Sequence, residues 1–293
     1  MNIDNRHTRI APSPTGYMHL GTARTAYFNW LAARSTGGSF LLRIDDTDTS
    51  RSDNKYLDSI YDSLSWLELD YDKVVKQSDR IDVYRSYLQK LIDKKVITFK
   101  DGAYFVSPDV LDMIPDNWND KLNRKPVKVS DYDKSVIANL VIWRSDDTPT
   151  YHFASCVDDI DLGINTIIRG VDHIANTAKH ILIYRMLDAP LPDYYHVGLL
   201  TDMSGKKYSK RNGAVSIPDL KGLGFGPDAV LNFMLRMGWG PSVDDKSTKK
   251  IDRNRALNMF WNDGHMRPAP SKVNMDTLGW FNKKYGYGTA TEV

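Results

Sequence analysis

Short apolar runs alternate with longer segments of helical periodicity over residues 8 to 97, and the alternation resumes at Thr150. The runs that predict strands are Arg9 to Ala11, Phe40 to Ile44, Thr166 to Arg169 and Tyr195 to Leu200. The segments that predict helices are an amphipathic one after Gly21, then Tyr56 to Leu67, Val83 to Lys94, Ala175 to Leu187 and Asp228 to Met237. Such alternation is typical of an α/β fold in which crossover helices connect the strands of a parallel sheet.

The pattern changes twice along the chain. From about Ile97 to Asp147 the apolar pieces are short and are interrupted by three prolines, which indicates an insertion. After Ser216 the chain turns helical. We therefore predict four regions: residues 1–97 and 150–218 as the two halves of a catalytic domain, 98–149 as a short α+β insertion, and 219–293 as a helical region.

Composition restricts the class of protein. The 293 residues are 41% hydrophobic and 26% charged, with a formal net charge of +2, so any nucleic-acid surface must be a local patch. Cys156 is the only cysteine, which excludes an internal disulfide and a multi-cysteine zinc site. Because no apolar run approaches the roughly 18 residues that span a bilayer, we expect a soluble protein in the reducing cytoplasm.

The first candidate functional segment runs from Pro12 to Thr22 and ends in His19, Leu20, Gly21 and Thr22. It lies between a predicted strand and a predicted helix. The N-terminus of a helix presents backbone N–H groups and the positive end of the helix dipole, both of which favour phosphate. Read alone, the segment also fits an ordinary helix start.

The second segment, Lys206 to Arg211, places several cations on a loop after the apolar run Tyr195 to Leu200. A cluster of cations is more often a solvated surface. Both segments, however, follow strands whose carboxyl ends would meet at one edge of the sheet, where open α/β sheets bind ligands. Their order and spacing favour a single nucleoside triphosphate site.

At this point the chain resembles a known family, the bacterial-type glutamyl-tRNA synthetases of class I, in a short form that lacks the anticodon-binding domain. His19 to Thr22 resembles the first signature of the class and Lys207 to Arg211 the second. Further similar stretches are Leu42 to Asp48, Pro149 to Ala154, Val157 to Asp159 and Ile168 to Thr177. The resemblance implies a Rossmann-like catalytic domain and a C-terminal region that contacts the tRNA stem.

The resemblance also implies the chemistry. ATP activates L-glutamate as glutamyl adenylate, which then acylates the 3′ end of tRNA, so catalysis is positional and electrostatic. His19, Lys207 and Lys210 are the implied catalytic residues. The implied ATP-binding residues are Gly21, Thr22, Asp172, Leu200, Ser209 and Arg211.

Selecting glutamate requires groups for two carboxylates and one ammonium. By resemblance, Arg9 and Arg169 hold the carboxylates, for which a planar guanidinium suits better than an ammonium. Asp45 is the implied acid facing the α-amino group. The other implied pocket residues are Ala11, Ser13, Tyr151 and Ser155.

The expected cofactor is ATP with Mg²⁺, and we expect no zinc and no dedicated metal site. The Asp45 to Asp48 run lacks the glycine and glutamate of a calcium-binding EF-hand loop. Val157 to Asp159 fits a turn that caps backbone N–H groups as well as it fits a contact with the tRNA terminus. The expected partners are L-glutamate and glutamate tRNA, bound by a monomer with no membrane contact.

Three departures from the family keep other functions open. Asp45 stands where bacterial glutamyl enzymes carry glutamate, the insertion lacks zinc-binding cysteines, and the chain ends where anticodon-binding domains would begin. The alternatives are a glutamyl-queuosine type enzyme that loads a modified tRNA base, a non-catalytic RNA-binding module, and a small nucleotidyltransferase. Intact His19, Lys207 and Lys210 argue against the non-catalytic module.

Glutamate and glutamine are both scarce. Glu68 and Glu292 are the only glutamates, and Gln77 and Gln89 the only glutamines. One hypothesis is an enzyme that also charges glutamine tRNA with glutamate, so that one activity supplies both residues. An amino-acid bias of the source organism explains the scarcity equally well.

Overall fold

The computed structural model describes residues 4–47, 52–208, 214–242 and 250–288. By its contacts the chain divides into two compact units. Unit 1 comprises Met1–Val75, Ile168–Val171 and His196–Val293, and unit 2 comprises Lys76–Ile167 and Asp172–Tyr195. The four sequence regions predicted above stay a prediction, since the units follow a different division of the chain.

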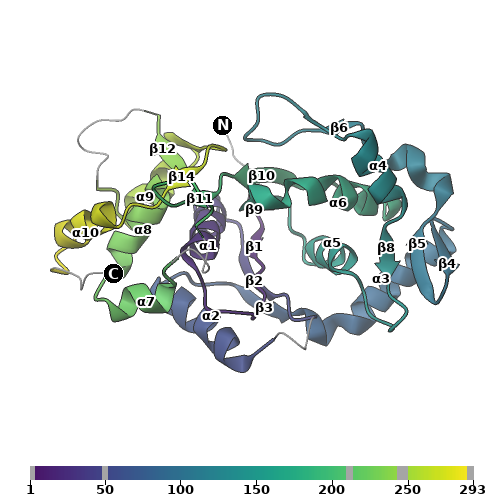
Figure 1. The fold of residues 1–293 in the computed structure, drawn as a ribbon, viewed down its shortest axis with the longest axis horizontal. Helices are drawn as coiled ribbons and strands as arrows, with labels where there is room; N and C mark the ends of the chain where they lie inside the picture. Colours follow the sequence, from purple (N-terminus) through teal and green to yellow (C-terminus); the bar gives the residue numbers. More distant parts are fainter. Residues whose placement is uncertain (1–3, 48–51, 209–213, 243–249, 289–293) are drawn as a thin grey trace. The chain divides into compact units, whose positions relative to one another are not determined.

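Unit 1 is built on a parallel pair of strands. β1 (Thr8–Ile10) pairs with β2 (Phe40–Ile44), with Thr8 opposite Phe40 and Ile10 opposite Leu42, and β3 (Lys73–Lys76) extends the sheet in the order β1-β2-β3. All eight residues of β1 and β2 are buried, as expected for strands covered on both faces. α1 (Leu20–Arg34) connects β1 to β2, and α2 (Asn54–Trp66) follows β2 (Figure 1). The α/β class predicted from the sequence is confirmed.

α1 is not the amphipathic helix that the sequence predicted. Eleven of its 15 residues are buried, among them Arg24 and Asn29. Each buried polar side chain bonds to backbone outside its own helix. Arg24 donates to the carbonyls of Gly198 (2.6 Å) and Met237 (2.9 Å), and Asn29 donates to that of Ile168 (2.9 Å). α1 is therefore the central helix of unit 1, enclosed on nearly every side.

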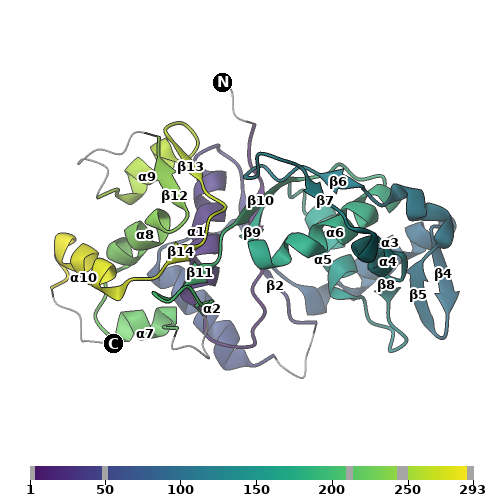
Figure 2. The same ribbon diagram turned by 45° about the horizontal axis from the view of Figure 1, so that its top comes forward.

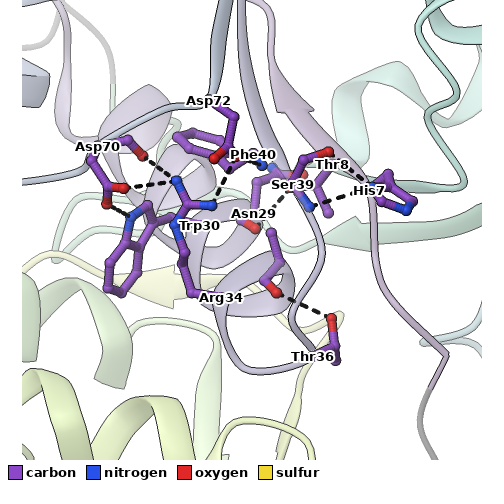
Figure 3. A network of polar contacts seen from close by, with 11 residues as sticks. His7, Thr8, Asn29, Trp30, Arg34, Thr36, Ser39, Phe40, Asp70 and Asp72 are labelled. Carbon is purple, nitrogen blue, oxygen red and sulfur yellow. Dashed lines mark hydrogen bonds and ion pairs between the residues drawn. The ribbon is translucent and has the colours of Figure 1, made fainter.

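A polar network fixes the edge of the β1-β2-β3 sheet (Figure 3). Arg34, in the last turn of α1, bridges the carboxylates of Asp70 and Asp72, each at 2.8 Å. Asp72 also accepts from the backbone N–H of Phe40 (2.7 Å), and Asp70 accepts from the indole N–H of Trp30 (2.7 Å). The network holds the chain that leads into β3 against the end of α1 and the start of β2.

The strand predicted from Tyr195 to Leu200 is broken in the structure, so that prediction was wrong in extent. β10 (Asp193–Val197) pairs with β9 (Thr166–Gly170), whereas β11 (Leu200–Thr201) pairs in parallel with β14 (Ser271–Lys272). The break falls at Gly198, where a Cβ would lie 2.1 Å from the carbonyl oxygen of Ala269. This close approach of two backbones requires glycine and lets the chain exchange one partner strand for another.

The C-terminal part of unit 1 is helical with short strands between its helices, so the purely helical prediction was incomplete. Its elements are α7 (Ile217–Gly222), α8 (Pro227–Arg236), β12 (Trp239–Pro241), α9 (Arg253–Met259), β13 (Gly264–Met266), β14 and α10 (Met275–Lys284). β12 and β13 form an antiparallel pair. α8 packs against both α1 and α10, which joins this region to the core of unit 1.

Unit 2 has its own hydrophobic core, centred on α5 (Tyr151–Asp161), α6 (Ile174–Met186) and a three-stranded antiparallel sheet in the order β4-β5-β8. The sheet strands are β4 (Ile97–Lys100), β5 (Ala103–Val106) and β8 (Val141–Trp143). The remaining elements are η1 (Gln77–Arg80), α3 (Ile81–Asp93), η2 (Pro108–Met113), β6 (Asn117–Trp118), β7 (Val127–Lys128), α4 (Asp131–Ala138) and η3 (Val171–His173).

The remaining sequence predictions of elements agree with the structure within two residues at each end, as for α2, α3, α6 and α8. Among the described residues no helix is long and apolar enough to cross a membrane.

Candidate functional site

His19 caps the N-terminus of α1. Its ring atom Nδ1 accepts a hydrogen bond from the Thr22 N–H (3.2 Å), and Nε2 lies 3.1 Å from Oγ1 of Thr22. Because Nδ1 accepts, the neutral ring carries its hydrogen on Nε2. No acidic residue occupies the first turn of α1, so its N–H groups and dipole keep their attraction for an anion. The arrangement suits a phosphate group that approaches the exposed His19.

The second signature begins as a tight hairpin. Thr201 pairs antiparallel with Lys207, and the Tyr208 N–H donates to the carbonyl of Leu200 (2.8 Å). Asp202 closes the turn by accepting from the Ser204 hydroxyl (2.7 Å) and the Lys206 N–H (2.9 Å). Ser209, Lys210 and Arg211, all predicted from sequence, lie outside the described residues.

The residues that flank the second signature lie beside the first signature in unit 1. His19 pairs antiparallel with Ser216, and the Ile217 N–H donates to the Met18 carbonyl (2.8 Å). At the other end of the second signature, Cδ1 of Leu200 lies 4.0 Å from the position of a Cβ on Gly21. The residues that enter and leave the second signature thus lie beside the first, although nearly two hundred positions separate the two in sequence.

Two buried arginines lie in different strands of unit 1. Arg9, in β1, is 6% exposed, and Arg169, in β9, is 7% exposed. Nε of Arg169 donates to Nε2 of His196 (3.0 Å), a residue of β10 that is itself buried. Sequence reasoning missed His196, whose signal was the only histidine in the predicted strand Tyr195 to Leu200. A guanidinium held by a fixed partner is oriented for a planar carboxylate.

Comparison with known proteins decides the family. The model of the family described as "tRNA synthetases class I (E and Q), catalytic domain" matches residues 6–104 and 111–280. The chain belongs to this class I synthetase family. The resemblance noted from sequence is thereby confirmed, and it covers both units.

Individual relatives agree. "Glutamate--tRNA ligase 1" of Helicobacter hepaticus is 38% identical over 320 residues, covering 97% of this chain and 67% of the relative. "Glutamate--tRNA ligase 2" of Wolbachia pipientis is also 38% identical, covering 95% and 67%. A crystal structure of a glutamate-tRNA synthetase from Elizabethkingia anophelis superimposes with a TM-score of 0.81 at 25% identity, over 96% of this chain and 70% of that one. The chain spans about two thirds of the length of these relatives.

Asp45 occupies a more constrained position in this synthetase domain than the sequence suggested. Its two carboxylate oxygens accept from Nε (2.6 Å) and the terminal Nη2 (3.0 Å) of Arg43, a side chain only 1% exposed. The Asp45 N–H donates to the Pro12 carbonyl (3.0 Å). An ammonium that approached Asp45 would therefore meet a carboxylate already neutralised by Arg43, which sequence reasoning did not identify.

Two predicted pocket residues lie in the segment that joins β1 to α1. Ala11 is half-buried directly after β1, and Ser13 is exposed, with its carbonyl accepting from the Thr15 N–H (2.9 Å). Both belong to unit 1, as do Arg9, Asp45 and Arg169.

The other predicted site residues of the synthetase belong to unit 2. Tyr151 and Ser155 lie in the first two turns of α5, where Ser155 is 1% exposed. The Tyr151 hydroxyl lies 3.5 Å from Nδ1 of His173, and Asp172 is in η3 immediately before that histidine. A second histidine contact, at 3.2 Å, joins Nδ1 of His152 to Nε2 of His180.

Of the two interpretations of Val157 to Asp159, the capping turn is wrong, because all three residues lie inside α5, and the contact with the tRNA terminus stays a prediction. Asp158 is fully buried and accepts from Gln77 (2.8 Å), Nε of Arg80 (2.7 Å) and the Tyr84 hydroxyl (3.0 Å). Burial lowers the pKa of Arg80, but its hydrogen bonds to Asp161 and Asp158 outweigh this and raise the pKa above its ordinary value. Asp158 therefore ties α5 to η1 and α3.

Metal ligands do not gather anywhere in the described parts of the chain: no group of three or more His, Cys, Asp or Glu residues could hold an ion. Any Mg²⁺ in the reaction would arrive with ATP as part of the substrate.

Proposed function

We propose that this protein is a glutamate–tRNA ligase. It activates L-glutamate with ATP and transfers the glutamyl group to the 3′ end of tRNA. The observation that carries the proposal is the antiparallel pairing of His19 with Ser216, a residue that follows the second signature by five positions. The names of the relatives and the buried pair Arg9 and Arg169 support glutamate as the amino acid.

The activation step needs no protein nucleophile. The substrate α-carboxylate attacks the α-phosphate of ATP, the P–O bond to the β-phosphate breaks, and pyrophosphate departs. His19 donates its Nε2 hydrogen to a phosphate oxygen in the transition state, with N–H groups of α1 beside it. Lys207 and Lys210 neutralise the charge that accumulates on pyrophosphate. Mg²⁺, bound to ATP, supplies further charge neutralisation.

Amino-acid selection depends on the two arginines. Arg169, oriented by His196, binds one substrate carboxylate and Arg9 the other. A substrate amide in place of the side-chain carboxylate would leave a buried guanidinium without its anion, which disfavours glutamine. Asp45, held by Arg43, faces the substrate amino group. Tyr151 and Ser155, which belong to unit 2, are assigned to glutamate binding by the family resemblance alone.

Lys210→Ala tests the mechanism. We expect glutamate-dependent exchange of pyrophosphate into ATP to fall by a factor of about 100 or more, with an unchanged thermal midpoint. Lys206→Ala is the matched control, since Lys206 is an exposed lysine whose backbone closes the same hairpin. Exchange at the wild-type rate in Lys210→Ala would remove the proposed mechanism.

Acylation of total tRNA with labelled glutamate and labelled glutamine tests the acceptor. We propose that glutamate tRNA is charged and that glutamine tRNA is charged with glutamate as well, which would account for the scarcity of both residues in the chain. Charging of glutamate tRNA alone contradicts the second half of the proposal. Label attached to an anticodon base instead of the 3′ end would favour the glutamyl-queuosine type of enzyme.

A further inference from the structure

A cavity of about 630 Å³ lies in unit 1 between α2 and α7, and neither Arg9 nor Arg169 lines it. The two helices lie side by side in both ribbon views (Figures 1 and 2). Its volume falls in the range of about 300–1,000 Å³ that holds small organic molecules. None of its lining residues is among those predicted to bind ATP or glutamate.

Two buried serines of α2 contribute to the wall of this cavity. Ser59 is 6% exposed and Ser63, one helical turn later, is 2% exposed. Neither hydroxyl has a hydrogen-bond partner among the described residues. A buried polar group without a partner costs free energy, and rotation about χ1 lets each hydroxyl donate to, or accept from, a polar group placed in the cavity.

The other wall groups are aromatic or apolar. Tyr17 and Trp66 supply ring surfaces, and Ile217 and Pro218 supply aliphatic surface from α7. Tyr17 is held edge-on by Tyr56, with ring centroids 5.2 Å apart. A planar aromatic group is the occupant that gains most from such walls, because it can stack on the rings while a polar atom on its edge meets a serine.

Charges of both signs stand at the rim. Lys55 and Lys221 contribute cations, and Asp58 and Asp62 contribute carboxylates. Lys55 is already engaged with Asp53 (3.2 Å), which leaves Lys221 as the cation on the α7 side. A purely anionic tail would be repelled by the two carboxylates, and a purely cationic tail by the lysines. A tail that carries both charges gains from each.

From these groups we propose that the cavity between α2 and α7 binds a free aromatic α-amino acid. The ring lies against Trp66, Tyr17 and the aliphatic groups of α7, with its polar edge hydrogen-bonded to Ser59 or Ser63. The carboxylate faces Lys221 and the ammonium faces Asp58 and Asp62. Glutamate, which lacks a ring, does not compete for this site.

The cavity walls are joined to the first signature turn. Tyr17 precedes His19 by two residues, the Ile217 N–H donates to the Met18 carbonyl (2.8 Å), and the Asp53 N–H donates to the Pro14 carbonyl (3.1 Å). A ligand that orders α2 and α7 therefore also affects the turn that holds His19. We expect the ligand and ATP to change each other's affinity by the same factor, and this second part rests on the proposed function.

Calorimetric titration of the full chain with L-tryptophan tests the binding. Saturable binding is expected below about 10 mM, and tryptamine and indole-3-propionate, which each lack one charge, should bind at least about fivefold more weakly. Ser63→Ala should weaken L-tryptophan binding about two- to tenfold, the equivalent of one neutral hydrogen bond. Its thermal midpoint should not fall, because the hydroxyl removed has no partner.

Ser65→Ala is the matched control, since Ser65 is an exposed serine of the same helix, and it should bind as the wild type does. No saturable binding of L-tryptophan overturns the proposal, as does equal binding of all three indole compounds or an equal effect of Ser63→Ala and Ser65→Ala. Binding with an unchanged affinity for ATP overturns only the second part. The titration measures binding and needs no ligase activity. Failure of the proposed function would therefore leave the test of L-tryptophan binding unaffected.

Discussion

Replacing Gly21 by alanine separates the role predicted for His19 from the stability of the fold. A Cβ on residue 21 would lie 3.1 Å from Nδ1 and 3.2 Å from Cε1 of His19. The ring must therefore move by a few tenths of an ångström, which weakens the hydrogen bond that Nδ1 accepts from the Thr22 N–H at 3.2 Å. The added methyl group would also lie 4.0 Å from Leu200, where adenosine is expected.

Gly21→Ala has two opposite effects on the free energy of unfolding, and they nearly cancel. Losing an N-cap hydrogen bond costs about 1 kcal/mol. Replacing glycine by alanine within a helix stabilises it by about 0.5–1 kcal/mol. The net change in the free energy of unfolding is thus about 1 kcal/mol or less, equal to about 3 °C in the thermal midpoint. Displacing a transition-state donor, in contrast, costs a factor of about 100–1,000 in rate.

The assay is glutamate-dependent pyrophosphate exchange, measured beside thermal unfolding. Gly279→Ala is the matched control, because Gly279 lies inside α10 with open space around it, and it should be fully active and slightly more stable. In a His19→Ala background, Gly21→Ala should add little further loss, since the ring that it displaces is gone. Wild-type exchange in Gly21→Ala would refute the reasoning.

Three further changes test other parts of the structure. Arg169→Lys loses the planar fork and the contact with His196, so KM for glutamate should rise about tenfold or more with KM for ATP unchanged; equal rises for both substrates would contradict a glutamate-specific role. Asp158→Asn removes the buried partner of Arg80 and should lower the free energy of unfolding in urea by about 3 kcal/mol, whereas a loss below about 1 kcal/mol would show that the network contributes little. Burial raises the pKa of Asp72, but hydrogen bonds from Arg34 and the Phe40 N–H outweigh this and place the pKa below its ordinary value. The stability that Asp72 contributes is then complete above its unfolded pKa of about 4 and is lost as pH falls through the folded value. The wild type should exceed Asp72→Asn in urea stability at pH 7 and the two should converge in acid, so a difference independent of pH would contradict the assigned pKa direction.

The elements were predictable wherever one periodicity dominated. β2 is a run of five buried residues, four of them apolar, and α3 presents Tyr84, Leu88 and Leu91 on one face. The ends of both elements were therefore predicted closely. α1 was predicted as a helix but not as a buried one, because Arg24 and Asn29 look like surface residues until their distant carbonyl partners are known.

The sequence predicts a list of candidate site residues but not the contacts that their side chains make. Signature motifs are local in sequence, so His19 and Lys207 could be named as candidates from the chain alone, and their catalytic roles stay a prediction. Arg43 and His196 could not, because their roles depend on which neighbour each side chain meets in space. The same holds for Asp158, where a polar run resembling a turn is buried inside a helix by partners about 80 positions away.

The exchange of strand partners at Gly198 makes the C-terminal region inseparable from the strand that leads into the second signature. β14 supplies the N–H of Ser271 to the Leu199 carbonyl (2.9 Å), and the Val273 N–H donates to Thr201 (2.8 Å). Deleting residues 264–293 would leave the carbonyls of Leu199 and Thr201 without these hydrogen-bond donors. The exposed strand edge would be prone to self-association. A shorter fragment that keeps every signature residue would therefore be expected to aggregate, so the smallest folded version of this enzyme extends at least through Val273.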